Sequence, residues 1–239
     1  MFGTASTGSS SSIAAMPGIF ADASGPAVVD RVAGAAQQEA LAANPLVSAM
    51  LRDRKTVFID RLGWDLESPD GLHELDQFDG EDTLYLVVHQ PETMRHLGSV
   101  RLLPSTGPHL LGDIYPQLCA DGVPRGADVW EITRLVTAPD LNRTQALQVR
   151  RQLSIALYEH ALATGITRYT MITHMPWLAS LLSIGWDAEP LGFPHGEGET
   201  AVAALQINID STTHQRLAQA WDMPATMLSK IGTEQTLAF

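Results

Sequence analysis

The hydrophobic and polar positions of the chain separate into strand-like and helix-like segments. Strand-like runs of aliphatic, aromatic and β-branched residues are short and are bounded by turn formers. Gln90-Pro91-Glu92 lies between the first two runs and is typical of a hairpin turn. We predict five strands: residues 83–88, 98–103, 129–136, 168–173 and 201–209, the last one buried.

Helix-like segments show the three-to-four-residue spacing of an amphipathic helix. The longest is residues 144–163, with apolar positions at Leu147, Leu153, Leu157 and Leu162. An Ala- and Gln-rich run ends before Asn44-Pro45, and residues 65–81 carry many acids and turn formers without a period, which predicts a loop. We predict five helices: residues 32–43, 46–58, 144–163, 177–184 and 213–230.

The order of these elements predicts one domain of the α/β class. An antiparallel meander is followed by a strand–helix–strand unit, which a single mixed, largely antiparallel central sheet flanked by helices would accommodate. The start of the chain is rich in Ser, Ala and Gly and shows no sustained period. We therefore predict a flexible N-terminal extension over residues 1–29 and a folded domain over residues 30–239.

Composition and charge narrow the class of protein. Of the 239 residues, 45% are hydrophobic and 18% charged, which is ordinary for a globular protein. The net charge of -12 argues against general nucleic-acid binding, and no apolar run is long enough to span a membrane. No basic residue precedes Arg31, so the charged start of a secretory signal is missing and a cytoplasmic location is expected.

Metal binding and disulfide formation have little support in the sequence. Cys119 is a single cysteine, which excludes an internal disulfide and a cysteine-rich metal site. The histidines at 160, 174, 195 and 214 are too scattered for a ligand pair on one helical turn. We expect no metal.

Charged and aromatic residues gather in three islands. Within the strand 129–136, alternation would place Glu131 and Thr133 on one face and Arg134 on the other. A carboxylate such as Asp76 or Asp79 could pair with Arg101 or Arg134, either in a salt-bridge network that only fastens a loop to the sheet or in a catalytic site. The islands are Arg54, Phe58 and Trp64; Glu74, Asp76 and Asp79; and Arg101, Glu131 and Arg134.

Taken in order, the islands resemble the acyl-homoserine-lactone synthases, the autoinducer synthases of bacterial quorum sensing. The resemblance covers about residues 50–209 and includes connecting phrases such as Arg101-Leu102-Leu103-Pro104 and Tyr115-Pro116-Gln117-Leu118. The family has Phe where this chain has Leu135 and Ser where it has Thr133. The matching pattern is Arg54-x3-Phe58-x5-Trp64, Glu74-x-Asp76-x2-Asp79, Arg101 and Trp130-Glu131-x2-Arg134.

The resemblance implies a fold similar to the GCN5-related N-acetyltransferases. Their central sheet splays open to admit the pantetheine arm of a thioester, here between residues 128–136 and 168–173. Residues 138–143 lack the glycine-rich pyrophosphate loop of ordinary acetyltransferases, which fits an acyl-carrier-protein donor better, with acyl-CoA still open. The other substrate is S-adenosylmethionine, with no permanently bound cofactor.

The resemblance also implies roles for individual residues. Glu131 would act as a general base through a water molecule, with Arg134 and Asp76 completing the catalytic group. Asp76 and Asp79 would meet the cationic groups of S-adenosylmethionine, directly or by holding the arginines. Arg54 or Arg101 would pair with its carboxylate, while Phe58 and Trp64 would close over the sulfonium and adenine.

A further set of arginines is expected to contact the donor. Arg143, Arg150, Arg151 and Arg168 cluster around the long helix and the next strand, where they predict a docking site for an acidic carrier protein or else a solvated helix face. Three other interpretations remain open from the residues. The chain could acylate a different amine, which would release no methylthioadenosine, or it could be a non-catalytic module that binds an acyl thioester or a signal. The islands could also serve only as structural support of the core.

Overall fold

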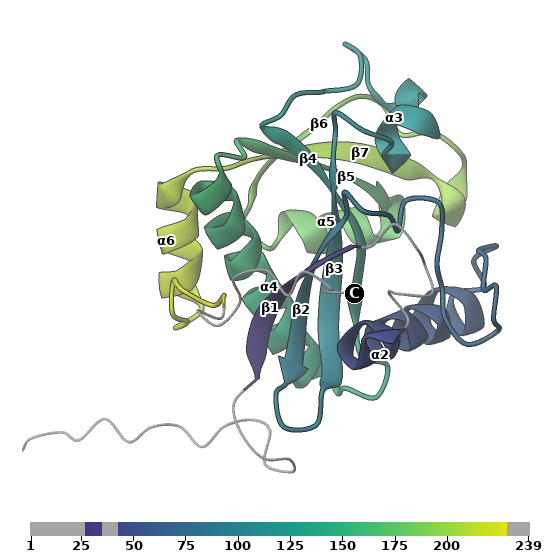
Figure 1. The fold of residues 1–239 in the computed structure, drawn as a ribbon. Helices are drawn as coiled ribbons and strands as arrows, with labels where there is room; N and C mark the ends of the chain where they lie inside the picture. Colours follow the sequence, from purple (N-terminus) through teal and green to yellow (C-terminus); the bar gives the residue numbers. More distant parts are fainter. Residues whose placement is uncertain (1–26, 35–42, 229–239) are drawn as a thin grey trace, which may run out of the picture.

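A computed structural model describes residues 27–34 and 43–228 of the chain. They form a seven-stranded sheet in the order β1-β2-β3-β4-β5-β7-β6 (Figure 1). β4 and β5 run parallel, and the other neighbouring pairs are antiparallel. The strands are β1 (Val28–Ala33), β2 (Leu84–Gln90), β3 (Arg95–Pro104), β4 (Val129–Thr137), β5 (Arg168–His174), β6 (Asp187–Pro190) and β7 (Val202–Asn208).

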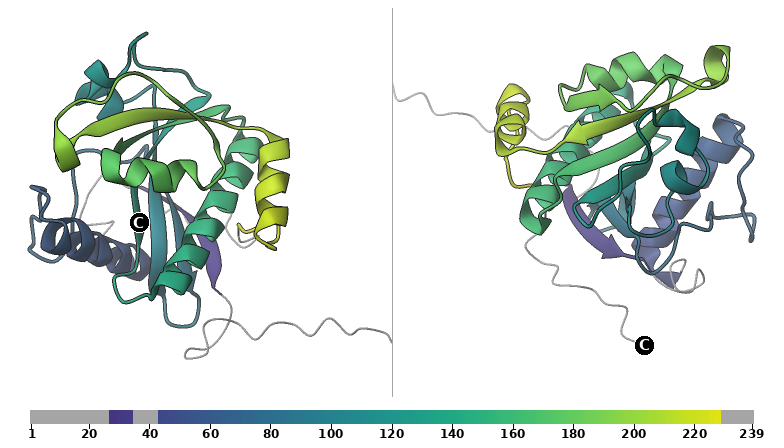
Figure 2. Two further views of the ribbon diagram at one scale, coloured as in Figure 1. Left: turned by 180° about the vertical axis from the view of Figure 1, so that it is seen from behind. Right: turned by 90° about the horizontal axis from the view of Figure 1, so that it is seen from above.

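Helices cover the sheet, with α4 and α5 lying together on the face turned toward the viewer in Figure 2, left. An Asn142–Gln145 capping box begins α4, and Gly165, with φ of 77°, ends it. None of the described helices is long and apolar enough to cross a membrane. The helices are α2 (Pro45–Arg54), the π-helix η1 (Lys55–Arg61), α3 (Leu110–Asp113), η2 (Pro116–Leu118), α4 (Arg143–Thr164), α5 (Met175–Leu182), η3 (Gly198–Thr200) and α6 (Ser211–Ala220).

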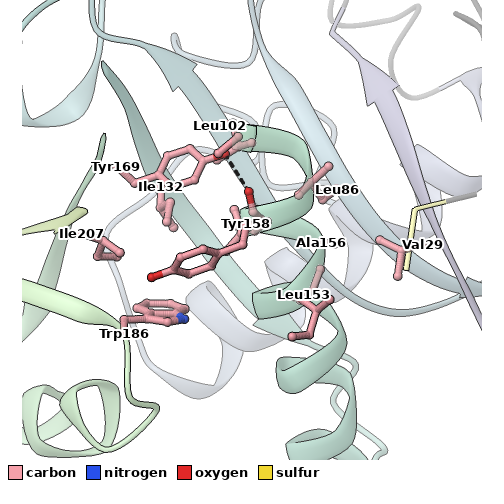
Figure 3. Close-up of a cluster of buried hydrophobic side chains, with 14 of the residues drawn as sticks. Val29, Leu86, Leu102, Ile132, Leu153, Ala156, Tyr158, Tyr169, Trp186 and Ile207 are labelled. Atoms are coloured by element: carbon pink, nitrogen blue, oxygen red, sulfur yellow. Dashed lines mark hydrogen bonds between the residues drawn. The ribbon is translucent and has the colours of Figure 1, made fainter. Parts of the chain in front are cut away.

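The main core lies between the sheet and α4 (Figure 3). Leu153 and Leu157 of α4 pack against strand residues such as Leu102 and Ile132, all fully or almost fully buried. The Tyr169 hydroxyl donates a hydrogen bond to the Leu157 carbonyl oxygen (3.2 Å), which ties β5 to the helix. A second, smaller core packs α2 against the opposite face of β2.

The central strands separate where the resemblance predicts a splay. β4 pairs with β5 from Val129–Arg168 to Ile132–Met171 and no further. Beyond that point β4 continues along β3 to Thr137, whereas β5 continues along β7 to His174. The edge of β4 that faces β5 therefore loses its ladder partners among the described residues, which leaves its backbone N–H groups there available to other acceptors.

A β-bulge overturns the prediction for the faces of β4. The register between β3 and β4 shifts between Ser99 and Arg101, and Arg134 takes a left-handed φ of 50°. The extra residue breaks the alternation. Thr133 and Arg134 thus reach the same cluster of charges, because Arg101 bonds Thr133 while Asp76 bonds both arginines.

The five predicted strands and the helices at 46–58, 144–163 and 177–184 are confirmed, with ends shifted by a few residues. The helix at 32–43 is wrong at its start, because Val32 and Ala33 belong to β1, and residues 35–42 lie outside the described residues. The predicted last helix, residues 213–230, is wrong at its end, because α6 runs only from Ser211 to Ala220, and residues 229 and 230 lie outside the described residues.

The proposed extension of residues 1–29 overlaps β1 at Val28 and Val29, and residues 1–26 lie outside the described residues. The two edge strands, β1 and β6, were not predicted, for a physical reason. Each edge strand has a single neighbour, so its sequence carries a weaker burial pattern than an interior strand.

Candidate active site

Three arginines and three carboxylates form one buried ionic network: Arg54, Glu74, Asp76, Asp79, Arg101 and Arg134. Arg54, the last residue of α2, donates from Nε to Glu74 (2.5 Å) and from both terminal nitrogens to Asp79 (2.9 Å each). The Tyr85 hydroxyl also donates to Asp79, at 2.7 Å. This bidentate geometry fixes the loop after the π-helix against the end of α2.

Arg101 and Arg134 extend the network to the edge of the splay. Arg101 donates to both oxygens of Asp76 (2.6 and 3.0 Å) and from Nε to Thr133 Oγ1 (2.8 Å). Arg134 donates to Asp76 Oδ2 (2.7 Å) and to Glu74 Oε1 (3.0 Å). Asp76 therefore bridges the two arginines that the bulge brings to one face.

Burial divides the network into an interior and an edge. The side chains of Arg54, Asp79 and Arg101 are at most 1% exposed, whereas those of Arg134 and Asp76 are 8% and 11% exposed. Although burial alone would raise it, the guanidinium groups of Arg54 and Arg101 hold the pKa of Asp79 well below its ordinary value. The interior thus stays ionised and supports the two residues at the edge.

Aromatic rings continue the site from the ionic network toward β5. The Arg134 guanidinium lies 5.7 Å from the centre of the Phe58 ring, and Phe58 stacks on Trp64 at 4.9 Å with an interplanar angle of 13°. Trp64 in turn lies 5.4 Å from the ring of His174. The backbone of Trp64 is tied to the π-helix by its N–H bond to the Phe58 carbonyl. We call Phe58, Trp64 and His174 the aromatic stack.

Glu131 lies apart from the network, beneath α3. Its two carboxylate oxygens accept the backbone N–H groups of Leu110 (2.8 Å) and Leu111 (2.7 Å), and the residue is fully buried. Burial raises the pKa of Glu131 to about 7, although the two N–H donors and Arg101 oppose the shift. In this conformation the carboxylate anchors the first turn of α3 and does not reach the surface of the site.

The raised pKa of Glu131 predicts a pH effect on stability. The folded protein binds this proton more tightly than the unfolded chain, whose pKa is near 4.5, so the stabilisation is full below pH 4.5 and is lost as pH rises through 7. The difference corresponds to about 3 kcal/mol. In urea unfolding, the free energy of unfolding of the wild type should fall as pH rises through 7, and we expect Glu131→Gln to lack this part of the fall. Parallel pH curves for the two proteins would contradict it.

A cavity of about 670 Å³ lies between α4, α5 and the free end of β4. Phe58 lines it and is also part of the aromatic stack, so the cavity and the ionic network meet at one residue. Within the described residues, no ion pair to a carboxylate involves the four arginines that line it, Arg61, Arg143, Arg150 and Arg151. Arg151 lies over Trp221, at 5.6 Å.

The structure brings most of the sequence-predicted site residues together. The ionic network and the aromatic stack include every predicted residue of the first two islands, together with Arg101 and Arg134. Three of the four arginines predicted to dock the donor line the cavity. Arg168 does not: it lies at the start of β5, where the two strands are still paired, and its side chain reaches Gln206. Arg61 and Trp186 also line the cavity and were not predicted, because no local sequence pattern marks a cavity wall.

Comparison with known proteins agrees with this geometry. The autoinducer synthase family model matches residues 38–217. An acyl-homoserine-lactone synthase of Ralstonia solanacearum is 33% identical over 171 residues, covering 70% of this chain and 83% of the relative. The isovaleryl-homoserine lactone synthase of Bradyrhizobium diazoefficiens is 32% identical over 176 residues, covering 73% and 78%.

Solved structures extend the comparison to the fold. BjaI, a CoA-dependent acyl-homoserine lactone synthase with SAM and isopentyl-CoA, superposes with a TM-score of 0.75 at 28% identity, over 87% of this chain and 95% of that one. TofI, with an inhibitor and MTA, gives 0.63 at 30% identity, over 83% and 97%. A putative N-acetyltransferase from Lactobacillus plantarum, at 19% identity and 0.52, shares the fold alone.

The splayed sheet, the cavity beside it and these similarities define an acyltransferase with a fold similar to the GCN5-related N-acetyltransferases. The chain belongs to the autoinducer synthase family. Its activity is that of an acyl-homoserine-lactone synthase, the enzyme class that makes quorum-sensing signals, as the resemblance predicts.

Proposed function

We propose that the chain acylates the amine of S-adenosylmethionine with an acyl thioester of coenzyme A, and that the product closes to the lactone with release of methylthioadenosine. The observation that carries this proposal is the position of Phe58, which touches the ionic network on one side and lines the 670 Å³ cavity on the other. Two substrates bound on either side of this ring would meet at the splay.

On the network side, the edge residues suit the two charges of an amino acid. The carboxylate of Asp76 attracts the ammonium group, and the guanidinium of Arg134 pairs with the carboxylate, while Phe58 and Trp64 offer ring faces to the sulfonium and adenine. Arg54, Asp79 and Arg101, being buried, act as positioning residues behind that edge. This replaces the direct contacts of Arg54 and Arg101 with substrate that the sequence suggested.

The reaction requires the chain mainly to position the two substrates. The neutral amine attacks the thioester carbonyl carbon, and the unpaired N–H groups of β4 beyond Ile132 stabilise the oxyanion before the thiol leaves. The substrate carboxylate then displaces methylthioadenosine from its own γ-carbon. For Glu131 we propose an anchoring role under α3 in place of the general-base role, because both of its oxygens accept α3 N–H groups.

On the cavity side, arginines without carboxylate partners among the described residues suit the phosphates of a phosphopantetheine thioester. Coenzyme A and acyl-carrier protein share that group. The CoA dependence of BjaI, at 28% identity, favours coenzyme A, and carrier protein is the alternative. The docking role predicted for Arg143, Arg150 and Arg151 becomes a phosphate-binding role, and Arg168 has no part in it.

Neutralising Arg150 and Arg151 together tests the donor site. We expect Arg150→Gln/Arg151→Gln to raise the KM for acyl-CoA by about tenfold or more, because each lost charge-assisted bond to phosphate contributes about 1.5–3 kcal/mol. The KM for S-adenosylmethionine should stay within about twofold, since it would bind on the other side of Phe58. Steady-state assays of methylthioadenosine release measure both values.

Two comparisons sharpen that experiment. Arg52→Glu, at an exposed position on α2 that is not part of the cavity lining, should leave the KM for acyl-CoA unchanged. Acyl-pantetheine, which lacks phosphate, should be a poor donor for the wild type and no worse for the double variant. Equal KM values for acyl-CoA in the wild type and the double variant would contradict the proposal. Efficient turnover with acyl-carrier protein but not with acyl-CoA would identify the carrier protein as the donor.

A further inference from the structure

The cavity beside the splay has an open end and a closed end. Near the start of α4, the side chains that line it are exposed, as those of Arg143 and Leu147 are. Further along the same helix, Leu153 and Leu157 line it and are at most 1% exposed. The helix axis from Arg143 to Leu157 is about 21 Å long. The cavity therefore runs inward from the arginines toward the core.

The opposite wall of the cavity shows the same change in burial. Trp177, in the first turn of α5, lines the cavity and is 54% exposed, whereas Trp186, which follows α5, lines it and is 8% exposed. Trp186 belongs to the main core together with Tyr158 and Ile207 (Figure 3). Among the described side chains that line the cavity and are buried, the indole of Trp186 is the largest. It therefore closes the inner end, together with Leu157.

Strand pairing places Trp186 away from the open end of the splay. Trp186 immediately precedes β6, and the first residue of β6 is aligned, through β7 and the start of β5, with Val129 at the start of β4. The part of β4 that pairs with β5 ends at Ile132, and its unpaired part includes residues 135–137, which line the cavity. A thioester held at the unpaired part of β4, with its phosphates at the arginines, thus directs its acyl chain toward Trp186.

We propose that Trp186 limits the length of the acyl chain that the enzyme accepts and restricts it to short chains, an inference that rests on the donor placement of the proposed function. The closed end, from Leu153 to Leu157, is only about 6 Å long. The indole is held in the core with Tyr158 and Ile207, so additional carbons would have to displace closely packed side chains. Trp186 acts by its shape, and no bond to it forms or breaks.

Trp186→Leu tests this role, because leucine is apolar and much smaller than the indole. For the wild type, we expect kcat/KM to be highest with butanoyl- or hexanoyl-CoA and at least about tenfold lower with decanoyl-CoA, since a single misfitting methylene is worth about tenfold or more. In Trp186→Leu, the value for decanoyl-CoA divided by that for hexanoyl-CoA should rise by about tenfold or more. Steady-state release of thiol from donors of four to ten carbons measures this ratio.

The ratio of the two donors separates this role from a loss of stability. A variant that is partly unfolded turns over every donor more slowly by the same factor, so its ratio does not change. Trp186→Phe, a smaller reduction in size, should raise the ratio by less than Trp186→Leu does. Trp177→Leu, the same change at the open end of the cavity, should keep the ratio within about twofold of the wild type.

Two results would overturn the proposal. An equal ratio in the wild type and Trp186→Leu would make Trp186 a core residue only, and a wild type that used hexanoyl- and decanoyl-CoA equally well would refute the restriction to short chains. Failure of the proposed donor is a separate result. If only acyl-carrier protein served as donor, a higher ratio in Trp186→Leu with hexanoyl and decanoyl chains on that protein would support the role of Trp186 and refute coenzyme A.

Discussion

Replacing Asp79 by alanine is expected to lower the free energy of unfolding by about 3–5 kcal/mol, the range for breaking one side of a buried ion pair. The change leaves the guanidinium groups of Arg54 and Arg101 buried without the carboxylate that both contact, and it removes the acceptor of the Tyr85 hydroxyl. Urea unfolding followed by tryptophan fluorescence measures the loss.

The control for Asp79 is an ion pair of similar length on the surface. Lys55 and Asp60 are 2.9 Å apart, with side chains 26% and 45% exposed. Asp60→Ala should cost less than about 1 kcal/mol, because water solvates both charges already. Losses of equal size in the two variants would mean that the network does not support the fold, and that its acids serve the substrate alone.

Removing the Arg134 side chain is expected to reduce kcat/KM for S-adenosylmethionine by about 100-fold, the effect of losing one or two charge-assisted hydrogen bonds in a buried site. Two variants separate activity from stability. Arg134 has a φ of 50°, so alanine keeps the backbone strain and glycine relieves it. Arg134→Gly and Arg134→Ala should be equally inactive, with the glycine variant more stable by about 1 kcal/mol.

Steady-state kinetics and urea unfolding of the two Arg134 variants check both parts. Retained activity in either variant would remove Arg134 from the substrate site. Alanine and glycine variants of equal stability would mean that the bulge relaxes once the side chain is gone, so that the network itself holds Arg134 in the left-handed conformation.

The strained position of Arg134 has a clear structural role. Without the bulge, alternation would point this side chain to the α4 face of the sheet, away from Glu74 and Asp76. The shift in register turns it into the network and against Phe58. A locally unfavourable backbone conformation thereby places a charge beside the opening between β4 and β5, where substrate would bind.

The family, the mixed sheet and most members of the site could be predicted from the order of the residues. Interior strands and the long helix can be predicted from the sequence because their burial follows a fixed local period, as in residues 83–88 and 144–163. The charged islands could be recognised because a buried charge needs a partner, so Arg101 and Arg134 predicted a nearby carboxylate such as Asp76 or Asp79. The pairing of Arg54 with Glu74 and Asp79 was not predicted.

Which of those residues faces a substrate depends on contacts that form only in the folded chain. The side of the sheet reached by Arg134 depends on a bulge that pairing with β3 creates, and the burial of Glu131 depends on α3 packing over it. Arg168 and Arg150 look alike in the sequence, but only Arg150 lines the cavity. Strand register and burial arise from contacts between distant segments, which no local period encodes.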